Sequence, residues 1–224
     1  MPQVTFITAY EYDELSDEAK QTALQWYRES DIDGHDRVQQ VTFELTDILT
    51  RLGYPTDPLE WSLGHCQGDG VAFYGTLCLE SFLEAQIRRQ TNPFPKEIPV
   101  YADSPDFKRT MERALCNYHK VVEDHGLRVK IVRNSYGYHY SHENTMKLDV
   151  EDCFYMEEPH PKLMAMWDRL FEWIGEDIRK VSKALADIGY DTLDWLSGEE
   201  YVADTLRANG YLFTEDGRRS IVLN

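Results

Sequence analysis

The stretch GLRVKIVRNSYGYHYSHENTMKLDVED, residues 126–152, decides the fold class. Apolar and polar residues alternate from Leu127 to Arg133, which is typical of a strand with one buried face. Alternation returns over residues 138–152, and the segment from Asn134 to Gly137 supplies turn residues between the two. The stretch therefore predicts an antiparallel hairpin that packs one face on a core and turns the other to water.

A second hairpin is expected around CQGDGVAFYG, residues 66–75. Gly68 and Gly70 tolerate positive φ angles, and Asp69 between them is a residue type that bonds its own backbone amides in turns. An aromatic, β-prone run follows directly. The motif therefore predicts a tight turn between two strands.

The longest predicted helix covers residues 161–188, where apolar residues recur every three or four positions. They are Leu163, Trp167, Leu170, Ile174, Ile178, Val181, Leu185 and Ile188. Further helices are expected over residues 16–30, 36–52, 81–90, 104–123 and 199–208.

Hairpins that are separated from clusters of helices are typical of the α+β class, and not of a doubly wound parallel sheet. We therefore expect one α+β domain over residues 1–224, with an antiparallel β-sheet of hairpins. Helices should pack on one face of that sheet, including the long helix in the C-terminal half. A proline-rich loop is expected at about residues 91–105.

The net charge of −17 limits the partners. Such a field repels nucleic acid, so we expect no direct DNA or RNA binding, and it suits a protein with a basic surface. No apolar run is long enough to span a bilayer and no secretory signal is recognisable, which favours the cytoplasm. The four cysteines show no CxxC pairing, and the composition indicates no oligomeric state.

A candidate binding site follows if the two hairpins are neighbours in the fold. The residues that would then border one surface are Gln67, Gly68, Asp69, Gly70, Phe73, Tyr74, Tyr138, His139, Tyr140 and His142. The glycines let a ligand or a partner backbone approach closely, the tyrosines offer faces on which a base or a partner side chain can stack, and Gln67 and Asp69 offer hydrogen bonds. The alternative interpretation is a plain turn beside core aromatics.

Neither a catalytic residue nor a metal ligand is assigned, and no cofactor is indicated. Cys66 has a histidine beside it, but neighbours on a strand point to opposite faces, so the two do not form a dyad. His139 and Glu143 share a face of the predicted strand and could meet Asp69 from the other hairpin, yet no His-x-Glu or HExxH spacing on a helix supports a metal site.

Four segments together resemble a family of small acidic proteins that tailed phages and prophages encode. They are YEYDELSDEAKQTALQWYRE at residues 10–29, CQGDGVAFYG at 66–75, HYSHENTMKLDVED at 139–152 and YVADTLRANGYLFTEDGR at 201–218. The family is often labelled "antitoxin of toxin–antitoxin stability system". The resemblance implies a role inside an infected host cell and no chemistry. His65 and Cys66 and the proline-rich segment depart from the family pattern.

We therefore expect a non-enzymatic, acidic phage protein that binds and inhibits or modulates a host factor. The expected targets are defence, restriction or toxin machinery with a basic face. Carboxylates of this protein would occupy that face by imitating the spacing of phosphates. One alternative is a small-molecule binder that sequesters a nucleotide-like signal between the QGDG turn and the tyrosine strand. Another is a metal-assisted hydrolase that uses Asp69 and His139.

Overall fold

The computed structural model describes residues 8–89, 91, 93–101, 105–118, 127–134, 140–151 and 161–220. Helices and small antiparallel sheets are mixed in this part of the chain, which confirms the predicted α+β class. The chain forms two compact units, one of residues 1–41 and 191–224 and one of residues 42–190. The sequence predicts one domain over residues 1–224, and in the structure the chain divides into these two compact units. Helices α2 (Gly34–Leu52) and α5 (Pro161–Leu196) each contribute to both units.

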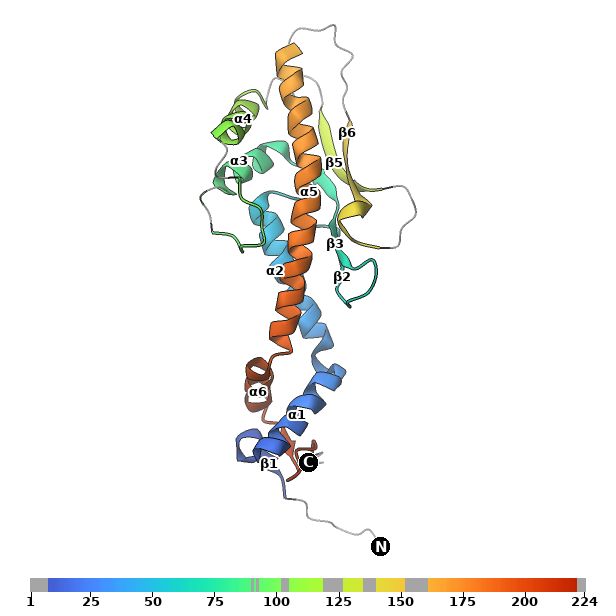
Figure 1. Cartoon of the computed structure of the whole chain (residues 1–224), viewed down its shortest axis with the longest axis vertical. Coiled ribbons are helices and arrows are strands. Elements are labelled where there is room, and N and C mark those ends of the chain that lie inside the picture. Colours follow the sequence, from blue (N-terminus) through green and yellow to red (C-terminus); the bar gives the residue numbers. More distant parts are fainter. Residues whose placement is uncertain are drawn as a thin grey trace. The chain divides into compact units, whose positions relative to one another are not determined.

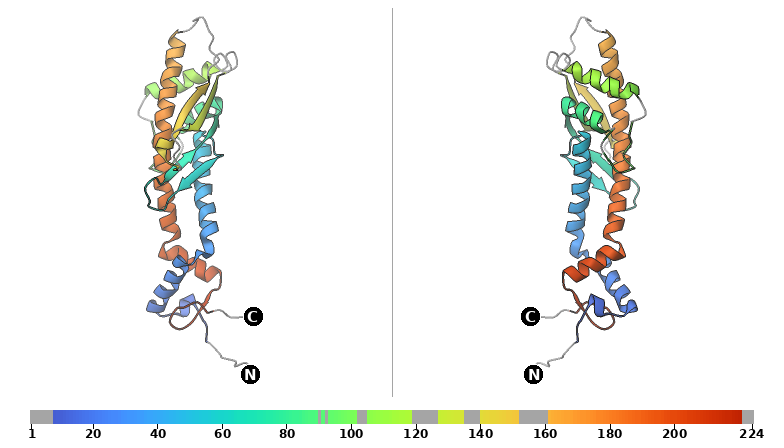
Figure 2. Two further views of the ribbon diagram at one scale, coloured as in Figure 1. Left: turned by 90° about the vertical axis from the view of Figure 1, so that its right-hand side faces the viewer. Right: turned by 90° about the vertical axis from the view of Figure 1, so that its left-hand side faces the viewer.

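The first unit consists of short elements around a small aromatic core. Its further elements are β1 (Tyr10–Glu11), the 3₁₀ helices Tyr12–Glu14 and Asp31–Asp33, α1 (Asp17–Glu29), α6 (Glu199–Ala208) and β7 (Leu212–Phe213). Helix α1 begins at its N-cap Ser16, whose side chain accepts a hydrogen bond from the Ala19 amide. Antiparallel pairing of β1 with β7 joins segments from the two halves of the unit (Figure 2). The core side chains include Tyr12, Leu24, Tyr27, Val202, Leu206 and Phe213.

The second unit holds the remaining strands and helices. They are β2 (Leu59–Ser62), β3 (Gly70–Phe73), β4 (Gly75–Leu77), α3 (Leu79–Arg89), α4 (Pro105–Cys116), β5 (Arg128–Arg133), a 3₁₀ turn (Glu143–Thr145) and β6 (Met146–Glu151). Strand β2 pairs with β3, and a second sheet has the order β4-β5-β6; every pair is antiparallel. Helix α5 runs between the strands on one side and α3 and α4 on the other (Figure 1). The Ser182 hydroxyl donates to the Val71 carbonyl and so joins α5 to β3.

The hairpin predicted over residues 126–152 exists, but its second strand is shorter than expected. Strand β5 pairs with β6 from Arg133↔Met146 onward, so residues 140–145 lie outside the ladder. The reason is local hydrogen bonding: the Thr145 hydroxyl donates to the His142 carbonyl, and the His142 ring accepts from the Asn144 amide. Such side-chain bonds compete with strand pairing.

Other predicted elements agree with the structure except at their ends. Helix α5 continues past the expected end at Ile188 to Leu196, and α3 begins two residues early at Leu79. The described part of the proline-rich loop, residues 93–101, contains neither helix nor strand. The glycine motif forms the predicted turn, with β2 and β3 on its two sides.

A buried carboxylate joins the helices of the second unit. Asp177 on α5 has no exposed surface and accepts three hydrogen bonds of 2.7 Å, from Arg89 Nη1, the Tyr54 hydroxyl and the Tyr101 hydroxyl. Burial, together with the charge of Asp177, raises the pKa of Tyr54. Because Arg89 belongs to α3 and Tyr54 follows α2, this cluster joins three helices and the loop at residue 101.

We predict that Asp177→Ala lowers the free energy of unfolding by about 3–5 kcal/mol, because the buried Arg89 charge, the buried Tyr54 hydroxyl and the partly buried Tyr101 hydroxyl would lose their shared acceptor. Urea denaturation measures the change. The matched control is Asp187→Ala, an exposed aspartate on the same helix, for which we expect less than about 0.5 kcal/mol. Equal effects of the two substitutions would contradict the structural role of the cluster.

Candidate functional site

The Asp69 carboxylate organises the turn that the sequence analysis singled out. It accepts hydrogen bonds from the Gly64 amide at 2.7 Å, the Cys66 amide at 2.7 Å, the Ser62 hydroxyl at 2.8 Å and the Tyr190 hydroxyl at 2.9 Å. Tyr190 lies on α5, so the turn is fastened to that helix. All four bonds favour the ionised carboxylate.

The same bonds hold the pKa of Asp69 low. The Cys66 amide is the main cause, and the bonds from Ser62, Tyr190 and Gly64 add to it, so the pKa falls from 3.8 to about 2. A carboxylate with this pKa and four donors is a poor proton acceptor near neutral pH. The geometry therefore gives Asp69 a structural role in the turn.

The two regions that the sequence analysis expected to be neighbours are in direct contact. A Cβ atom added at Gly68 would lie 2.4 Å from the Tyr140 ring, and one added at Gly70 would lie 2.6 Å from the His142 Cβ. In addition, the Phe73 amide donates to the Met146 sulfur across 3.2 Å. The contact leaves no space for a ligand between each glycine and the ring or backbone that it touches.

The predicted site residues divide into exposed and buried groups. Gln67 is exposed, Tyr140 is 49% exposed and His142 is half-buried, so these three meet solvent. Phe73 is fully buried and Tyr74 nearly so, and both pack in the core. Tyr138 and His139 lie outside the described residues.

Polar contacts hold residues 140–142 against strand β2. Arg133 forms an ion pair with Glu60, and Arg133 Nη1 donates to the Tyr140 carbonyl at 3.2 Å. The Ser141 hydroxyl donates to the same Glu60 carboxylate at 2.9 Å. The exposed Tyr140 ring is thus presented on a fixed backbone.

Cys66 has no imidazole partner among the described residues, and its thiol donates to the Gly64 carbonyl at 3.5 Å. His65 stacks on Tyr190 with ring centroids 4.5 Å apart, and this contact directs the imidazole toward α5. Among the residues that the structure describes, no three His, Cys, Asp or Glu side chains gather closely enough to hold a metal ion. His139, which the hydrolase hypothesis requires, lies outside that part of the chain.

A different site, which the sequence analysis missed, lies in the first unit. We call it the acidic pocket: a cavity of about 400 Å³ lined by Trp195, Glu200, Tyr201, Asp204, Thr205 and Ala208. Trp195 is 61% exposed, and its ring centroid lies 4.7 Å from that of Tyr201. The accessible indole and the carboxylates thus border one small cavity.

The two carboxylates of the acidic pocket differ in their partners. Asp204 pairs with Arg207 at 2.7 Å, one helical turn along α6. Glu200 forms no ion pair within the described part of the chain and is exposed in the first turn of α6. The pocket therefore offers one uncompensated carboxylate beside an accessible indole.

A sequence signal for this pocket exists but is weak. Glu200, Tyr201, Asp204, Thr205 and Ala208 follow the i, i+4 spacing that places residues on one helix face. Trp195 comes from the last turn of α5, beyond the end predicted at residue 188. Only the fold joins it to α6.

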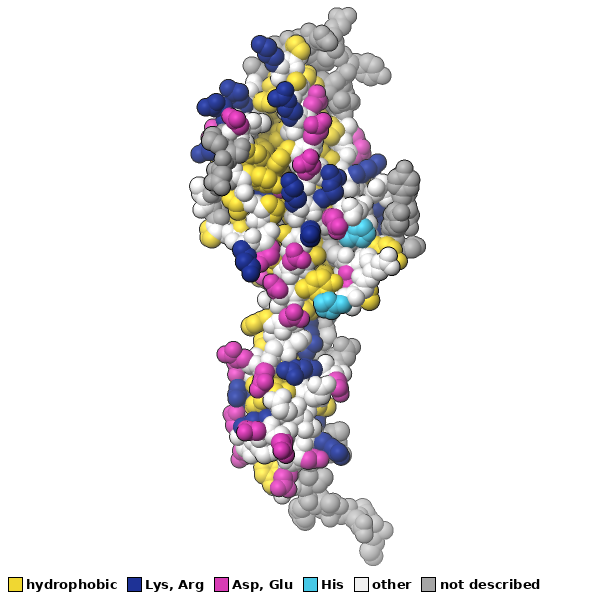
Figure 3. Space-filling view, in the orientation of Figure 1, with side chains coloured by type: hydrophobic (Ala, Val, Ile, Leu, Met, Phe, Trp, Pro, Cys, Tyr) yellow, Lys and Arg dark blue, Asp and Glu magenta, His cyan; other side chains and the backbone are white. Residues whose placement is uncertain are grey.

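Negative charge is concentrated in the first unit. Its residues include 16 acidic and 6 basic side chains, a net charge of −10, whereas the larger second unit has 24 and 17, a net charge of −7. Carboxylates are spread over the face of the first unit that Figure 3 shows. The first unit thus has the higher charge density.

Comparisons with protein-family models, with curated proteins and with solved structures find no match for this chain. None of its described helices is long and apolar enough to cross a membrane. The resemblance to the phage family therefore stays an expectation from the sequence.

We predict that the stabilising effect of Asp69 depends on pH. Its folded-state pKa is depressed, so the stabilisation is present above about pH 4 and is lost as the pH falls toward 2. Urea denaturation should show that Asp69→Asn is less stable than the wild type near neutral pH, and that the difference shrinks between about pH 4 and 2. The control, Asp168→Asn at an exposed position of α5, should show a small and nearly constant difference. A constant deficit for Asp69→Asn would contradict the assignment.

We also predict that Gly68→Ala destabilises the fold by about 1–3 kcal/mol, because φ at Gly68 is +94° and the new methyl group meets the Tyr140 ring. In a Tyr140→Ala background the cost should fall by about 0.5 kcal/mol or more. Gly210→Ala measures backbone strain alone, since Gly210 has φ of +61° and nothing within 4 Å of an added Cβ. If the cost of Gly68→Ala does not depend on Tyr140, the two segments are not in contact.

Proposed function

We propose that the protein is a non-catalytic binding protein that uses its acidic first unit to occupy a basic, nucleic-acid-binding face of another protein. Following the phage resemblance, the partner is a host factor of the defence, restriction or toxin machinery, which the protein inhibits or modulates. The observation that carries the proposal is the acidic pocket, in which the exposed Trp195 lies beside Glu200, a carboxylate with no ion pair to any residue that the structure describes.

The chemistry of this pocket favours a cationic side chain. An arginine or lysine over an aromatic face gains about 0.5–1 kcal/mol at an exposed site, and more when water is excluded. The Glu200 carboxylate supplies a charge-assisted hydrogen bond to the same group. A guanidinium satisfies both contacts because it is planar and carries several donors.

Exposed carboxylates elsewhere on the first unit support the same kind of partner. Exposed acids of the first unit include Asp13, Asp17, Glu18, Glu29, Asp191, Asp194, Glu199, Glu215 and Asp216. A basic face that holds nucleic acid is built to meet repeated negative charges. Charges of this kind act mainly on the association rate and on specificity, while the aromatic contact adds affinity.

We predict that a fluorescent nona-arginine peptide binds the full-length protein, with a dissociation constant that rises with salt. Trp195→Ala should weaken binding about 5–10-fold, and Glu200→Gln should weaken it several-fold. Fluorescence anisotropy measures both. The matched control is Glu80→Gln, because Glu80 is also exposed, is also the second residue of its helix and changes the net charge equally.

The control is expected to change the affinity less than about twofold. Equal effects at Glu80 and Glu200, or binding that does not depend on salt, would contradict the proposed face.

A second prediction concerns the partner. If the acidic face imitates nucleic acid, excess duplex DNA should release a nucleic-acid-binding protein that this chain holds. A complex that retains the partner in excess DNA would contradict mimicry.

A further inference from the structure

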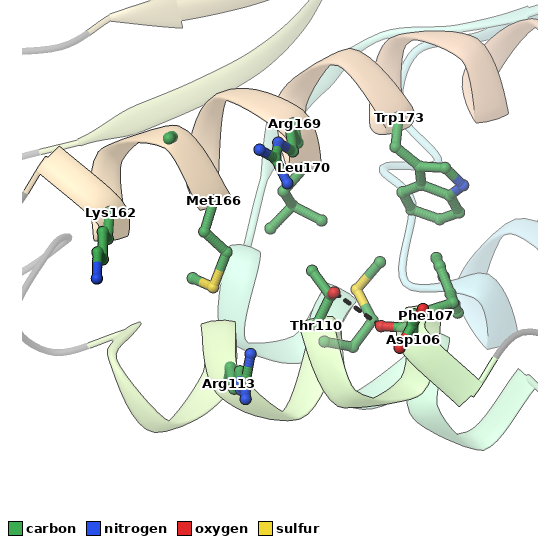
Figure 4. Close-up of a pocket in the computed structure, with 11 residues that line it drawn as sticks. Asp106, Phe107, Thr110, Arg113, Lys162, Met166, Arg169, Leu170 and Trp173 are labelled. Carbon is green, nitrogen blue, oxygen red and sulfur yellow. Dashed lines mark hydrogen bonds between the residues drawn. The ribbon is translucent and has the colours of Figure 1, made fainter.

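A groove between α4 and the N-terminal half of α5 differs in charge from the rest of the chain. We call it the basic groove; its volume is about 590 Å³. Its lining residues in the second unit are Asp106, Phe107, Thr110, Met111, Arg113, Lys162, Ala165, Met166, Arg169, Leu170 and Trp173 (Figure 4). Its volume is within the range usual for small-molecule sites.

The floor of the basic groove is apolar and adaptable. Met111 and Leu170 are buried, while Met166 is partly exposed and points into the space between the two helices (Figure 4). Unbranched methionine side chains adjust their shape to a bound apolar body. The floor therefore accommodates a flexible chain.

One end of the floor is held rigidly. The Phe107 and Trp173 rings lie 4.7 Å apart between centroids, and Tyr101 packs on both at 5.1 and 5.3 Å. The Tyr101 hydroxyl is in turn bonded to the buried Asp177. This end of the groove is therefore tied to the packing of α3 and α5.

The rim of the basic groove carries three cations. Arg113 lies on α4, and Lys162 and Arg169 lie on α5; all three are exposed, and none forms an ion pair within the described part of the chain. Asp106 is the one carboxylate among the lining residues. Figure 3 shows apolar side chains between these helices with Lys and Arg around them.

We infer that the basic groove binds an amphiphilic organic anion with an acyl chain. Its carboxylate or phosphate head would lie at the rim formed by Arg113, Arg169 and Lys162. Its chain would lie against Met166 and the Phe107 and Trp173 rings, above the buried Met111 and Leu170. In a protein of net charge −17, three exposed cations that form no ion pair with any described residue make the rim of this groove a local site for an anion. This site is separate from the acidic pocket and does not depend on the function proposed for it.

The test is calorimetric titration of the full-length protein with dodecanoate and with dodecyl phosphate, each below its critical micelle concentration. Both should bind, and their relative affinity identifies the preferred head group. Dodecanol, which lacks the charge, and inorganic phosphate, which lacks the chain, should bind at least tenfold more weakly. AMP and an acidic amphipathic helical peptide should also bind more weakly.

Variants locate the binding. Arg169→Glu should weaken dodecanoate binding at least tenfold, whereas Arg179→Glu, at another exposed arginine of α5 that does not line the groove, should change it less than twofold. Met166→Gln should weaken dodecanoate binding without weakening the much lower affinity for phosphate. Thermal denaturation confirms that each variant is folded.

Three results would overturn the inference. Equal binding of dodecanol and dodecanoate would remove the role of the cations. Equal effects of Arg169→Glu and Arg179→Glu on dodecanoate binding would show that binding follows the overall charge of the protein and not the cations of the groove. Tighter binding of AMP or of the acidic peptide would replace the acyl anion by a nucleotide or by a protein segment.

Discussion

Helix α5 carries one carboxylate, Asp177, within its buried stripe, and the packing of the second unit depends on the pairing of that charge. Asp177 accepts bonds from Arg89, Tyr54 and Tyr101, and these residues come from α3, from the segment after α2 and from the loop at residue 101. A buried carboxylate without such donors is strongly unfavourable. The cluster therefore selects one arrangement of these segments and, through Tyr101, fixes the aromatic end of the basic groove.

The Asp69 turn is a second polar anchor on the same helix. Tyr190 donates to Asp69 and stacks on His65, so α5 holds the turn as well as the cluster around Asp177. With Asp69 fixed, Gly68 and Gly70 lie directly on Tyr140 and His142. The residues that make this motif prominent in the sequence thus serve chiefly to join two β-segments. Of the predicted site residues, Gln67, Tyr140 and His142 still meet solvent.

The sequence was sufficient for the fold class and for most elements, because periodicity reports which face of an element is buried. It was insufficient where side-chain hydrogen bonds and contacts between elements decide the outcome. Asp177 lies three residues after Ile174, within the apolar stripe, and only its three donors reveal why a carboxylate is tolerated there. The second strand of the hairpin begins late because Thr145 and His142 bond each other. The acidic pocket needs Trp195 from α5 and Glu200 from α6, and no local pattern joins them.

The charge distribution links the two proposals. The first unit has the higher negative charge density, whereas the basic groove of the second unit is lined by three cations that form no ion pair with any residue the structure describes. The central claim is that each surface binds a ligand of opposite charge in its own unit. Hydrogen–deuterium exchange of the full-length protein with and without each probe tests this most directly. Nona-arginine should slow exchange in residues 195–208, and dodecanoate should slow it in residues 105–116 and 161–173. Slowed exchange in the same segments with both probes, or none in these segments, would contradict the account.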